Sequence, residues 1–379
     1  MRLKGVARSF IIPLAISLVA FIVPPARSQQ KGGAPPSNEG ETVEQVKKNI
    51  QVLKGLPASQ LTMVMNYFAS SLGVKCEHCH VIDTTGWYME KDDKPAKATA
   101  RKMIQMVMDV NAKDFEGRHA VTCYTCHRGS TEPTNVIPLP QPAAKPEDEN
   151  AEDAASLPGA EQLIAGYESA LGGADALKKV TSRMSKGVAV DMQGHEMPVE
   201  VLQQSSGKYV SSVTMKEGMT RSEGYDGTAG WMSSPRGAHA FSPGESEEFK
   251  NKGALFPTIR MRELAKSMSV RKKDMVVGKA AYLLVAETGE GTTERYYIDI
   301  ASGLLVRKVI VTGTKIGDIP EQVDYTDYRA VDGVKVPFSV QIAAVDPRDN
   351  SAQRFTSITQ NVPVDEKKFV MPEVKPRKK

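Results

Sequence analysis

The 379-residue sequence predicts a two-domain α+β protein, in which an all-α N-terminal domain is followed by a mostly antiparallel β domain. Apolar residues recur at helical spacing in two stretches before residue 131. Residues 132–158 then carry six prolines and an acidic run, a composition typical of a stiffened linker. From residue 159 onward, short runs rich in β-branched and aromatic residues alternate with turn residues, as in antiparallel sheets.

The N-terminus predicts export. Residues 1–28 combine a basic start with the apolar run 10–23, which is shorter than a membrane-spanning helix, and end in small residues. We therefore expect a signal peptide and a periplasmic mature protein, with an uncleaved N-terminal anchor as the alternative. Residues 29–41 are rich in Gly, Pro and Ser and predict a flexible leader.

The charge argues against a nucleic-acid-binding protein. Loss of residues 1–28 removes four basic residues and no acidic ones, which brings the formal net charge of +4 to zero. A neutral chain lacks the basic surface that binds phosphates, and the basic tail 374–379 is expected to be solvated.

The domain boundaries follow these changes in composition. We expect an all-α domain over residues 42–131, which holds every cysteine, the linker over 132–158 and the β domain over 159–373. Helices are expected over 57–75 and 97–113 in the first domain. The second domain should begin with a helix over 160–171, and a further helix is expected over 256–268. Seven strands are expected in it: 187–192, 209–215, 281–288, 294–300, 304–312, 321–331 and 335–345.

The chain has four cysteines, and they form two C-x-x-C-H motifs. The first motif is Cys76, Cys79 and His80; the second is Cys123, Cys126 and His127. Two thiols at this spacing can bond to the two vinyl groups of one porphyrin, and the following histidine can ligate its iron. The sequence therefore predicts two covalently bound haem c groups, with His80 and His127 as iron ligands.

Two other uses of the cysteines compete with haem. The four thiols could bind one zinc ion, or each pair could form a disulfide in an oxidising compartment. Neither use requires a histidine directly after each pair, whereas haem attachment does.

The first motif follows a helix that could supply the sixth ligand of its iron. Ser59 is expected to cap this helix and Gly73 to end it. Its expected packing stripe consists of Leu61, Met65, Phe68 and Leu72. Met63 lies about 200° around the helix from Leu61, and a methionine facing away from the stripe could reach an iron. The helix before the second motif offers Met103, Met106 and Met108, and spacing does not distinguish them.

Four stretches of this region resemble the photosynthetic reaction-centre cytochrome c subunit family: 49–53, 62–80, 100–111 and 121–129. The resemblance implies Met63 as the ligand at the first haem and Met103 at the second. It also implies electron transfer with redox partner proteins, such as a membrane-bound electron-transfer complex. This sequence has two C-x-x-C-H motifs where well-known members have four, so docking to a reaction centre is not implied.

The second domain resembles the outer-membrane lipoprotein carrier (LolA-like) superfamily, through the stretches 224–231, 298–308, 327–338 and 361–369. This resemblance implies an antiparallel half-barrel with covering helices and an apolar cavity for a lipid-like molecule or a quinone. A plain scaffold or docking module is the alternative. Taken together, we expect an exported dihaem electron-transfer protein and not an enzyme. A dihaem peroxidase and a lipid or quinone carrier remain as competing functions.

Overall fold

The computed structural model describes residues 41–134, 157–215, 218–235, 237–241, 243–257, 261–262, 265–288 and 292–373. The predicted signal peptide (1–28), the leader up to residue 40, linker residues 135–156 and the basic tail (374–379) lie outside the described residues. Among the described helices, none has the length and apolar character needed to span a membrane.

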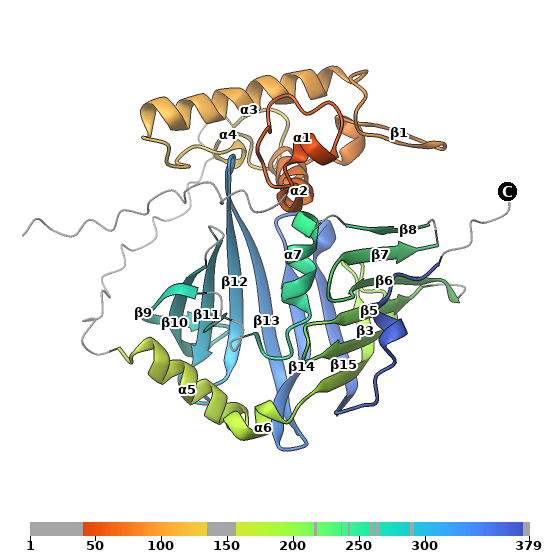
Figure 1. The fold of residues 1–379 in the computed structure, drawn as a ribbon. Helices are drawn as coiled ribbons and strands as arrows, with labels where there is room; N and C mark the ends of the chain where they lie inside the picture. Colours follow the sequence, from red (N-terminus) through yellow and green to blue (C-terminus); the bar gives the residue numbers. More distant parts are fainter. Residues whose placement is uncertain are drawn as a thin grey trace, which may run out of the picture. The chain divides into compact units, whose positions relative to one another are not determined.

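The helices and strands are numbered along the chain (Figure 1). The helices are α1 (Val43–Val46), η1 (Ala58–Gln60), α2 (Leu61–Leu72), η2 (Cys76–His78), α3 (Pro95–Asp114), α4 (Cys123–His127), α5 (Ala160–Leu171), α6 (Ala174–Lys178), α7 (Pro243–Lys252), η5 (Pro347–Asp349) and η6 (Glu366–Phe369). The strands are β1 (Val81–Asp83), β2 (Gly86–Tyr88), β3 (Ser182–Val190), β4 (Glu196–Gln204), β5 (Tyr209–Thr214), β6 (Thr220–Tyr225), β7 (Gly230–Ser234), β8 (Gly237–Ala240), β9 (Ala265–Val276), β10 (Lys279–Thr288), β11 (Thr292–Asp299), β12 (Leu305–Thr314), β13 (Gly317–Val331), β14 (Val334–Ala343) and β15 (Ser351–Gln360).

Most of the described chain forms one antiparallel sheet of 13 strands, in the order β8-β7-β6-β5-β4-β3-β15-β14-β13-β12-β11-β10-β9. No pairing joins β8 to β9 among the described residues, so the sheet is open. The seven predicted strands are confirmed, in β3, β5 and β10 to β14. The predicted half-barrel is wrong. The 13 strands pair side by side in one open sheet, with β8 at one edge and β9 at the other.

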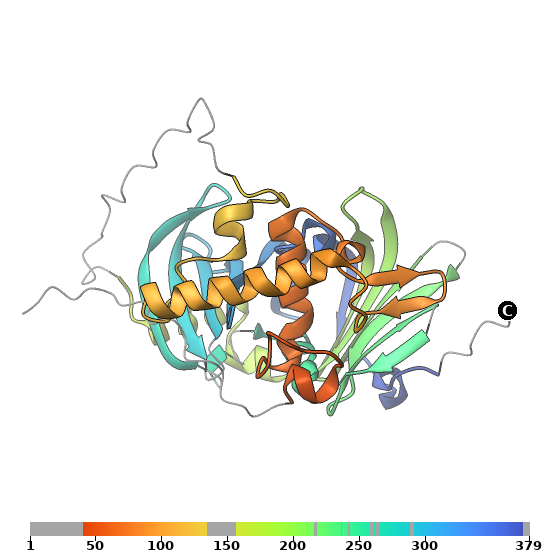
Figure 2. The same ribbon diagram turned by 90° about the horizontal axis from the view of Figure 1, so that it is seen from above.

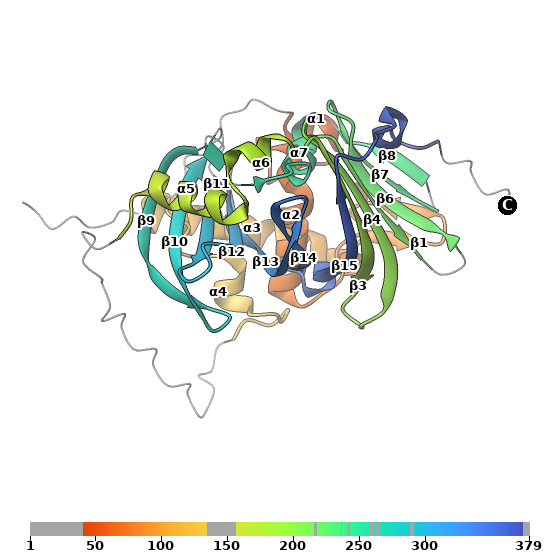
Figure 3. The same ribbon diagram turned by 90° about the horizontal axis from the view of Figure 1, so that it is seen from below.

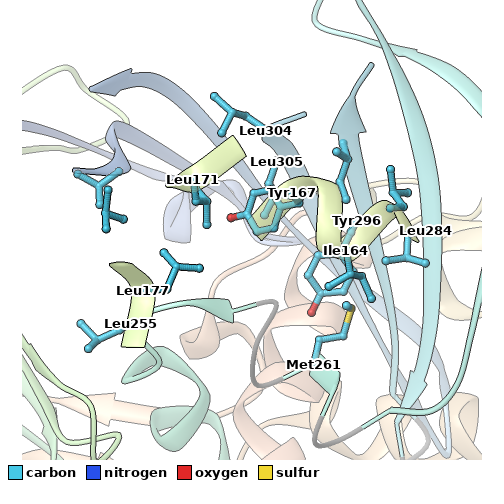
Figure 4. Close-up of a cluster of buried hydrophobic side chains, with 14 of the residues drawn as sticks. Ile164, Tyr167, Leu171, Leu177, Leu255, Met261, Leu284, Tyr296, Leu304 and Leu305 are labelled. Carbon is cyan, nitrogen blue, oxygen red and sulfur yellow. The ribbon is translucent and has the colours of Figure 1, made fainter. Parts of the chain in front are cut away.

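The main core lies between this sheet and helix α5. Buried residues of α5, among them Ile164 and Tyr167, pack with Leu284, Tyr296 and Leu305 of β10 to β12 (Figure 4). Figure 3 shows α5 and α6 on one side of these strands. The predicted helix over 160–171 is confirmed residue for residue.

The helix predicted over 256–268 is wrong in its last part, because β9 begins at Ala265. This strand lies at the edge of the sheet and carries lysines and an arginine along its length. Charged residues on an edge strand prevent pairing with other chains, but they also remove the alternating apolar pattern by which strands are recognised.

Residues 42–131, called the motif segment below, contain helices α2 and α3, of 12 and 20 residues. Helix α2 ends at Gly73, whose φ of 66° is the left-handed conformation expected of a C-cap glycine. The predicted cap at Ser59 is wrong, since residues 58–60 form a turn of 3₁₀ helix and Gln60 precedes α2. Helix α3 begins with Pro95 and crosses α2 (Figure 2). The residues of α2 that are most deeply buried are Val64, Tyr67, Ala69 and Ser71, one position away from the predicted stripe.

The predicted fold class is wrong for the motif segment as well. Directly after the first motif, β1 and β2 form an antiparallel hairpin, so this segment is not all-α and the described protein is mostly β. Asp83 supports the turn of the hairpin, because its carboxylate accepts hydrogen bonds from the backbone of Thr85 and Gly86. Strands of three residues are too short to show an alternating pattern, which explains why the sequence did not reveal them.

The motif segment does not close its own core. Two buried residues of the β12–β13 hairpin, Ile316 and Ile319, pack with Val43, Leu56, Val64 and Ile104. These two residues lie at the tip of the β12–β13 hairpin, which also donates from Lys315 Nζ to the carbonyl of Lys54 at 2.5 Å. The hairpin tip therefore completes the hydrophobic core of the motif segment, against which Cys123 of the second motif packs.

Candidate functional site

The first motif, called site 1, forms a tight turn after α2. The backbone N–H of His80 donates to the carbonyl of Cys76 at 2.9 Å, and that of Cys79 donates to the same carbonyl at 3.2 Å. This turn brings both cysteines and the histidine together within five residues. His78, between the cysteines, is exposed.

The imidazole of His80 is oriented by the backbone of the following hairpin. Its Nδ1 lies 3.2 Å from the carbonyl oxygen of Met89, the residue after β2. Because a carbonyl oxygen can only accept a hydrogen bond, Nδ1 carries the proton and Nε2 keeps its lone pair. Burial lowers the pKa of His80, which further favours the neutral ring that a metal requires.

Lys97 of α3 donates to the same carbonyl and is linked through Asp92 to Arg101. Lys97 Nζ donates to the carbonyl of Met89 at 2.8 Å, to that of Lys91 at 2.7 Å, and pairs with Asp92 at 3.0 Å. Arg101 also pairs with Asp92 at 3.0 Å. Hydrogen bonds from Arg101, then from Asn49 and Lys97, hold the pKa of Asp92 well below its usual value.

The second motif, called site 2, forms the short helix α4. The backbone N–H of Thr122 donates to Thr125 Oγ1 at 3.0 Å and fixes the start of the helix. His127 Nδ1 lies 2.9 Å from the carbonyl oxygen of Ser130, so its Nε2 also keeps its lone pair. The chain leaves α4 through Arg128, whose φ of 49° is left-handed.

Helix α2 packs directly against site 2. Hydrogen bonds join the Tyr67 hydroxyl to Thr122 and to the backbone of Tyr124, and burial raises the pKa of Tyr67. The backbone N–H of Gly129 donates to the carbonyl of Ser71 at 2.9 Å. A Cβ added to Gly73 would lie 2.1 Å from the carbonyl oxygen of Gly129, so the glycine at position 73 allows the close contact.

The tip of the β12–β13 hairpin forms another wall of site 2. Gly317 lies so close to Thr122 that an added Cβ would be 3.1 Å from Thr122 Cγ2. Asp318 Oδ1 lies 3.4 Å from Nδ1 of His119, the histidine that precedes the second motif. Because Nδ1 of His119 faces this carboxylate, the ring contributes to the contact between the motif segment and the sheet.

The four cysteines are present as free thiols, so neither pair forms a disulfide. Burial raises the pKa of Cys79 and raises that of Cys123 to about 11. Among the described residues, no three His, Cys, Asp or Glu side chains converge in a way that could hold a metal ion. The arrangement therefore does not support a zinc site built from both cysteine pairs.

The predicted methionine ligands lie on the helices that cross. Met63 is half-buried on α2 and contacts the core of the motif segment. Met103 lies on α3 with 38% of its surface exposed, and Met106 on the same helix is 46% exposed. Met108 packs against the core. The structure thus describes where each methionine lies, and ligation of iron by Met63 and Met103 stays a prediction.

Sequence reasoning missed the groups that set the environment of each histidine. In the sequence, charged residues such as Asp92, Lys97 and Arg101 are typical of the solvated start of any helix. Backbone carbonyls leave no sequence signal at all. The only available hint was the histidine of each motif itself, because a histidine that binds iron usually donates its other ring N–H to a nearby acceptor.

The residues present fit haem c at both sites. Each site offers two free thiols and a histidine on one turn, and each histidine has a protonated Nδ1 bound to a carbonyl and a free Nε2. Haem c bound there would supply a one-electron iron couple.

Comparisons with known proteins agree with these motifs. Residues 23–169 match the model of the photosynthetic reaction centre cytochrome C subunit family. Cytochrome c-554 of Chloroflexus aurantiacus is 36% identical over 95 residues, which are 23% of this chain and 21% of that protein. The photosynthetic reaction center cytochrome c subunit of Thermochromatium tepidum is 35% identical over 98 residues, 25% of this chain and 23% of that protein. The chain therefore spans only about a fifth to a quarter of these relatives.

Solved structures similar to the chain include a LolA superfamily protein from Nitrosomonas europaea, with a TM-score of 0.39 and 7% identity, covering 56% of this chain and 98% of that one. A putative outer membrane lipoprotein-sorting protein domain from Vibrio parahaemolyticus has a TM-score of 0.39 and 11% identity, covering 57% of this chain and 97% of that one. Residues 23–169 are thus identified as similar to the photosynthetic reaction-centre cytochrome c subunit family, the resemblance predicted from the two motifs.

Proposed function

We propose that the chain is an exported c-type cytochrome that transfers electrons through two covalently bound haems, one at site 1 and one at site 2. The observation that carries this proposal is the repeated histidine geometry. In both motifs the Nδ1 proton is committed to a backbone carbonyl, so Nε2 is left as a ligand.

The residue roles follow from this geometry. Cys76 and Cys79 would attach one haem, and Cys123 and Cys126 the other. His80 and His127 would be the proximal ligands. We propose Met63 and Met103 as the distal ligands, because a methionine sulfur in the sixth position closes the iron to small substrates and favours electron transfer over catalysis.

The partners are proposed on the same grounds. The family matched by residues 23–169 is that of a subunit of a larger complex, which supports redox partner proteins, including a membrane-bound one. A periplasmic location agrees with the predicted signal peptide and with covalent haem attachment through free thiols.

The first test is the number of haems. The intact mass of the purified mature protein, expressed with a haem-attachment system, should exceed that of the polypeptide by two haem groups. Cys76→Ala/Cys79→Ala and Cys123→Ala/Cys126→Ala should each remove one haem. A purified wild-type protein without covalent haem contradicts the proposal.

The second test separates electron transfer from a peroxidase-like enzyme. The reduced wild-type protein should bind little carbon monoxide, and the ferric protein should show methionine-to-iron charge transfer. Met63→Leu and Met103→Leu should each remove one methionine signal and open one iron to carbon monoxide, whereas Met106→Leu serves as the matched control. Ready carbon monoxide binding by the wild-type protein would favour the enzyme.

A buried arginine in the sheet favours a second candidate function, a carrier of a lipid-like molecule or a quinone. Arg183 on β3 is 8% exposed, and within the described part of the chain its Nε and Nη2 have no hydrogen-bond partner, while Nη1 donates to the carbonyl of Leu255 at 3.1 Å. Buried donors without partners are costly, and an oxygen-bearing ligand would satisfy them. Mass spectrometry of a solvent extract tests this candidate: a bound amphiphile that is lost in Arg183→Met supports it, and an empty wild-type protein contradicts it.

A further inference from the structure

The two sites share a hydrogen bond but differ in what surrounds its acceptor. At site 1 the carbonyl of Met89 accepts from His80 Nδ1 and also from Lys97 Nζ. At site 2 the carbonyl of Ser130 accepts from His127 Nδ1, and no lysine or arginine among the described residues donates to it.

The ammonium group of Lys97 is held firmly against this carbonyl. Its three contacts, with the carbonyls of Met89 and Lys91 and with Asp92, match the three protons that an ammonium can donate. The Lys97 side chain is only 11% exposed and that of Arg101 is 16% exposed, so solvent screens these two charges less than it would at the surface. Asp92, whose side chain is 47% exposed, pairs with both.

These contacts have a definite electronic consequence for His80. A carbonyl that already accepts from an ammonium group is a weaker acceptor for Nδ1–H, so the ring gains less negative character and donates less to a metal. The same cations also disfavour the more positive, oxidised state of a nearby iron by direct repulsion. Both effects raise the reduction potential, and the first is absent at His127, where no lysine or arginine of the described residues donates to the Ser130 carbonyl.

We propose that Lys97, acting through the Met89 carbonyl and His80, makes site 1 the higher-potential of the two haem sites. Lys97 is a positioning residue, since it touches the acceptor of the ligand's hydrogen bond and not the ligand. This inference rests on the proposed dihaem cytochrome and adds the direction of electron flow: an electron shared between the sites resides mainly at site 1.

The test is a spectroelectrochemical titration of the full-length mature protein. Lys97→Gln should lower the potential of one haem by about the equivalent of a tenfold change in its reduction equilibrium, which is 59 mV for a one-electron couple. Lys97→Arg keeps the positive charge, so the potential of this haem should stay close to the wild-type value. Asp92→Asn removes the compensating carboxylate and should move the same haem in the opposite direction, to higher potential.

Two further variants assign the measured potential to site 1 and control for the loss of a lysine elsewhere on α3. Cys123→Ala/Cys126→Ala leaves site 1 alone, and its remaining potential should match the higher wild-type value and respond to Lys97→Gln. Lys113→Gln on the same helix removes a lysine whose side chain is 74% exposed and should shift neither haem. If Lys97→Gln does not fold, the Asp92→Asn variant tests the inference, because it should shift the potential of the same haem upward.

The inference is overturned if Lys97→Gln moves neither potential, moves both equally, or if the site that responds is the lower-potential one. An Asp92→Asn shift that is absent or downward also overturns it. The intact mass distinguishes this failure from that of the proposed function: a protein with two haems and no shift refutes only the role of Lys97, whereas a protein without two haems refutes the cytochrome itself.

Discussion

Sites 1 and 2 begin from the same five-residue motif and end in different surroundings. Both place the histidine Nδ1 against a backbone carbonyl. Site 1 continues into an exposed hairpin whose Trp87 is 62% exposed, and its polar contacts come from α3. Site 2 packs against α2 and against the tip of the β12–β13 hairpin. The motif thus determines how a haem can be attached, and the tertiary packing determines what surrounds it.

The contact between α2 and site 2 gives the largest predicted effect. Gly73→Ala would place a Cβ 2.1 Å from the backbone oxygen of Gly129 and would also force a left-handed alanine. We expect a loss of more than about 4 kcal/mol in the free energy of unfolding, because backbone must move, together with loss of haem at site 2 before site 1. Denaturant unfolding and haem content measure both.

Gly117 provides the matched control for this prediction. Its φ of 77° is also left-handed, but an added Cβ would meet nothing within 4 Å. Gly117→Ala should therefore cost only the strain of a left-handed residue, about 1–2 kcal/mol, and leave the haem content unchanged. Equal losses for the two variants would show that the contact with Gly129 is unimportant.

The hairpin tip gives the next largest effect. Ile316 is 1% exposed in the core of the motif segment, and Ile316→Ala should cost about 2–5 kcal/mol because it leaves a cavity. Since the tip touches Thr122 and His119 of the site 2 loop, the spectrum of the site 2 haem should change while that of site 1 is preserved. Ile300→Ala, at a position 40% exposed, is the control and should change the free energy of unfolding far less. A spectral change confined to the site 1 haem would contradict the prediction that the hairpin tip supports site 2.

The same two sites show what the sequence could and could not predict. The motifs, the helix end at Gly73 and the helix over 160–171 were predictable, because thiol spacing, left-handed glycine and apolar periodicity are local properties. The packing stripe of α2 was predicted one position away, because the tip of β12–β13 completes the core of the motif segment from about 250 residues further along the chain. Ile316 and Ile319 look like ordinary strand residues in the sequence.

The fold class failed for a related reason. Six strands of the sheet were not predicted, among them β9 and β15, whose exposed positions carry charged and polar residues. A strand in an open sheet with one solvated face needs few apolar residues, so its pattern is weak. The cations at site 1 were missed because only the folded hairpin brings the Met89 carbonyl to His80 and Lys97.

The residue directly after the second motif gives a smaller predicted effect on the free energy of unfolding. Arg128 is left-handed with φ of 49°, whereas the residue after His80 enters a strand. Arg128→Gly should relieve about 1–2 kcal/mol of strain and lose about 0.5–1 kcal/mol through the freer unfolded chain, for a net gain of about 0.5 kcal/mol. Asp332→Gly, at φ of 49° in the turn between β13 and β14, should gain a similar amount. A loss in the free energy of unfolding in Arg128→Gly alone would show that the arginine side chain stabilises site 2.

The smallest predicted effect is a pH dependence that belongs to site 1. The pKa of Asp92 is lowered in the folded protein by Arg101, Asn49 and Lys97, so the folded state favours the ionised carboxylate. Its contribution to stability should be complete above the usual Asp pKa of about 3.9 and should be lost as the pH falls through the lowered folded value. The difference in melting temperature between wild type and Asp92→Asn should accordingly be constant near neutral pH and shrink in acid. Asp109→Asn, which removes a carboxylate 3.9 Å from Lys113, should show a smaller difference throughout. An Asp92→Asn difference that grows as the pH falls would mean that the carboxylate opposes folding at site 1, and the network of Lys97, Arg101 and Asp92 would then not stabilise this site.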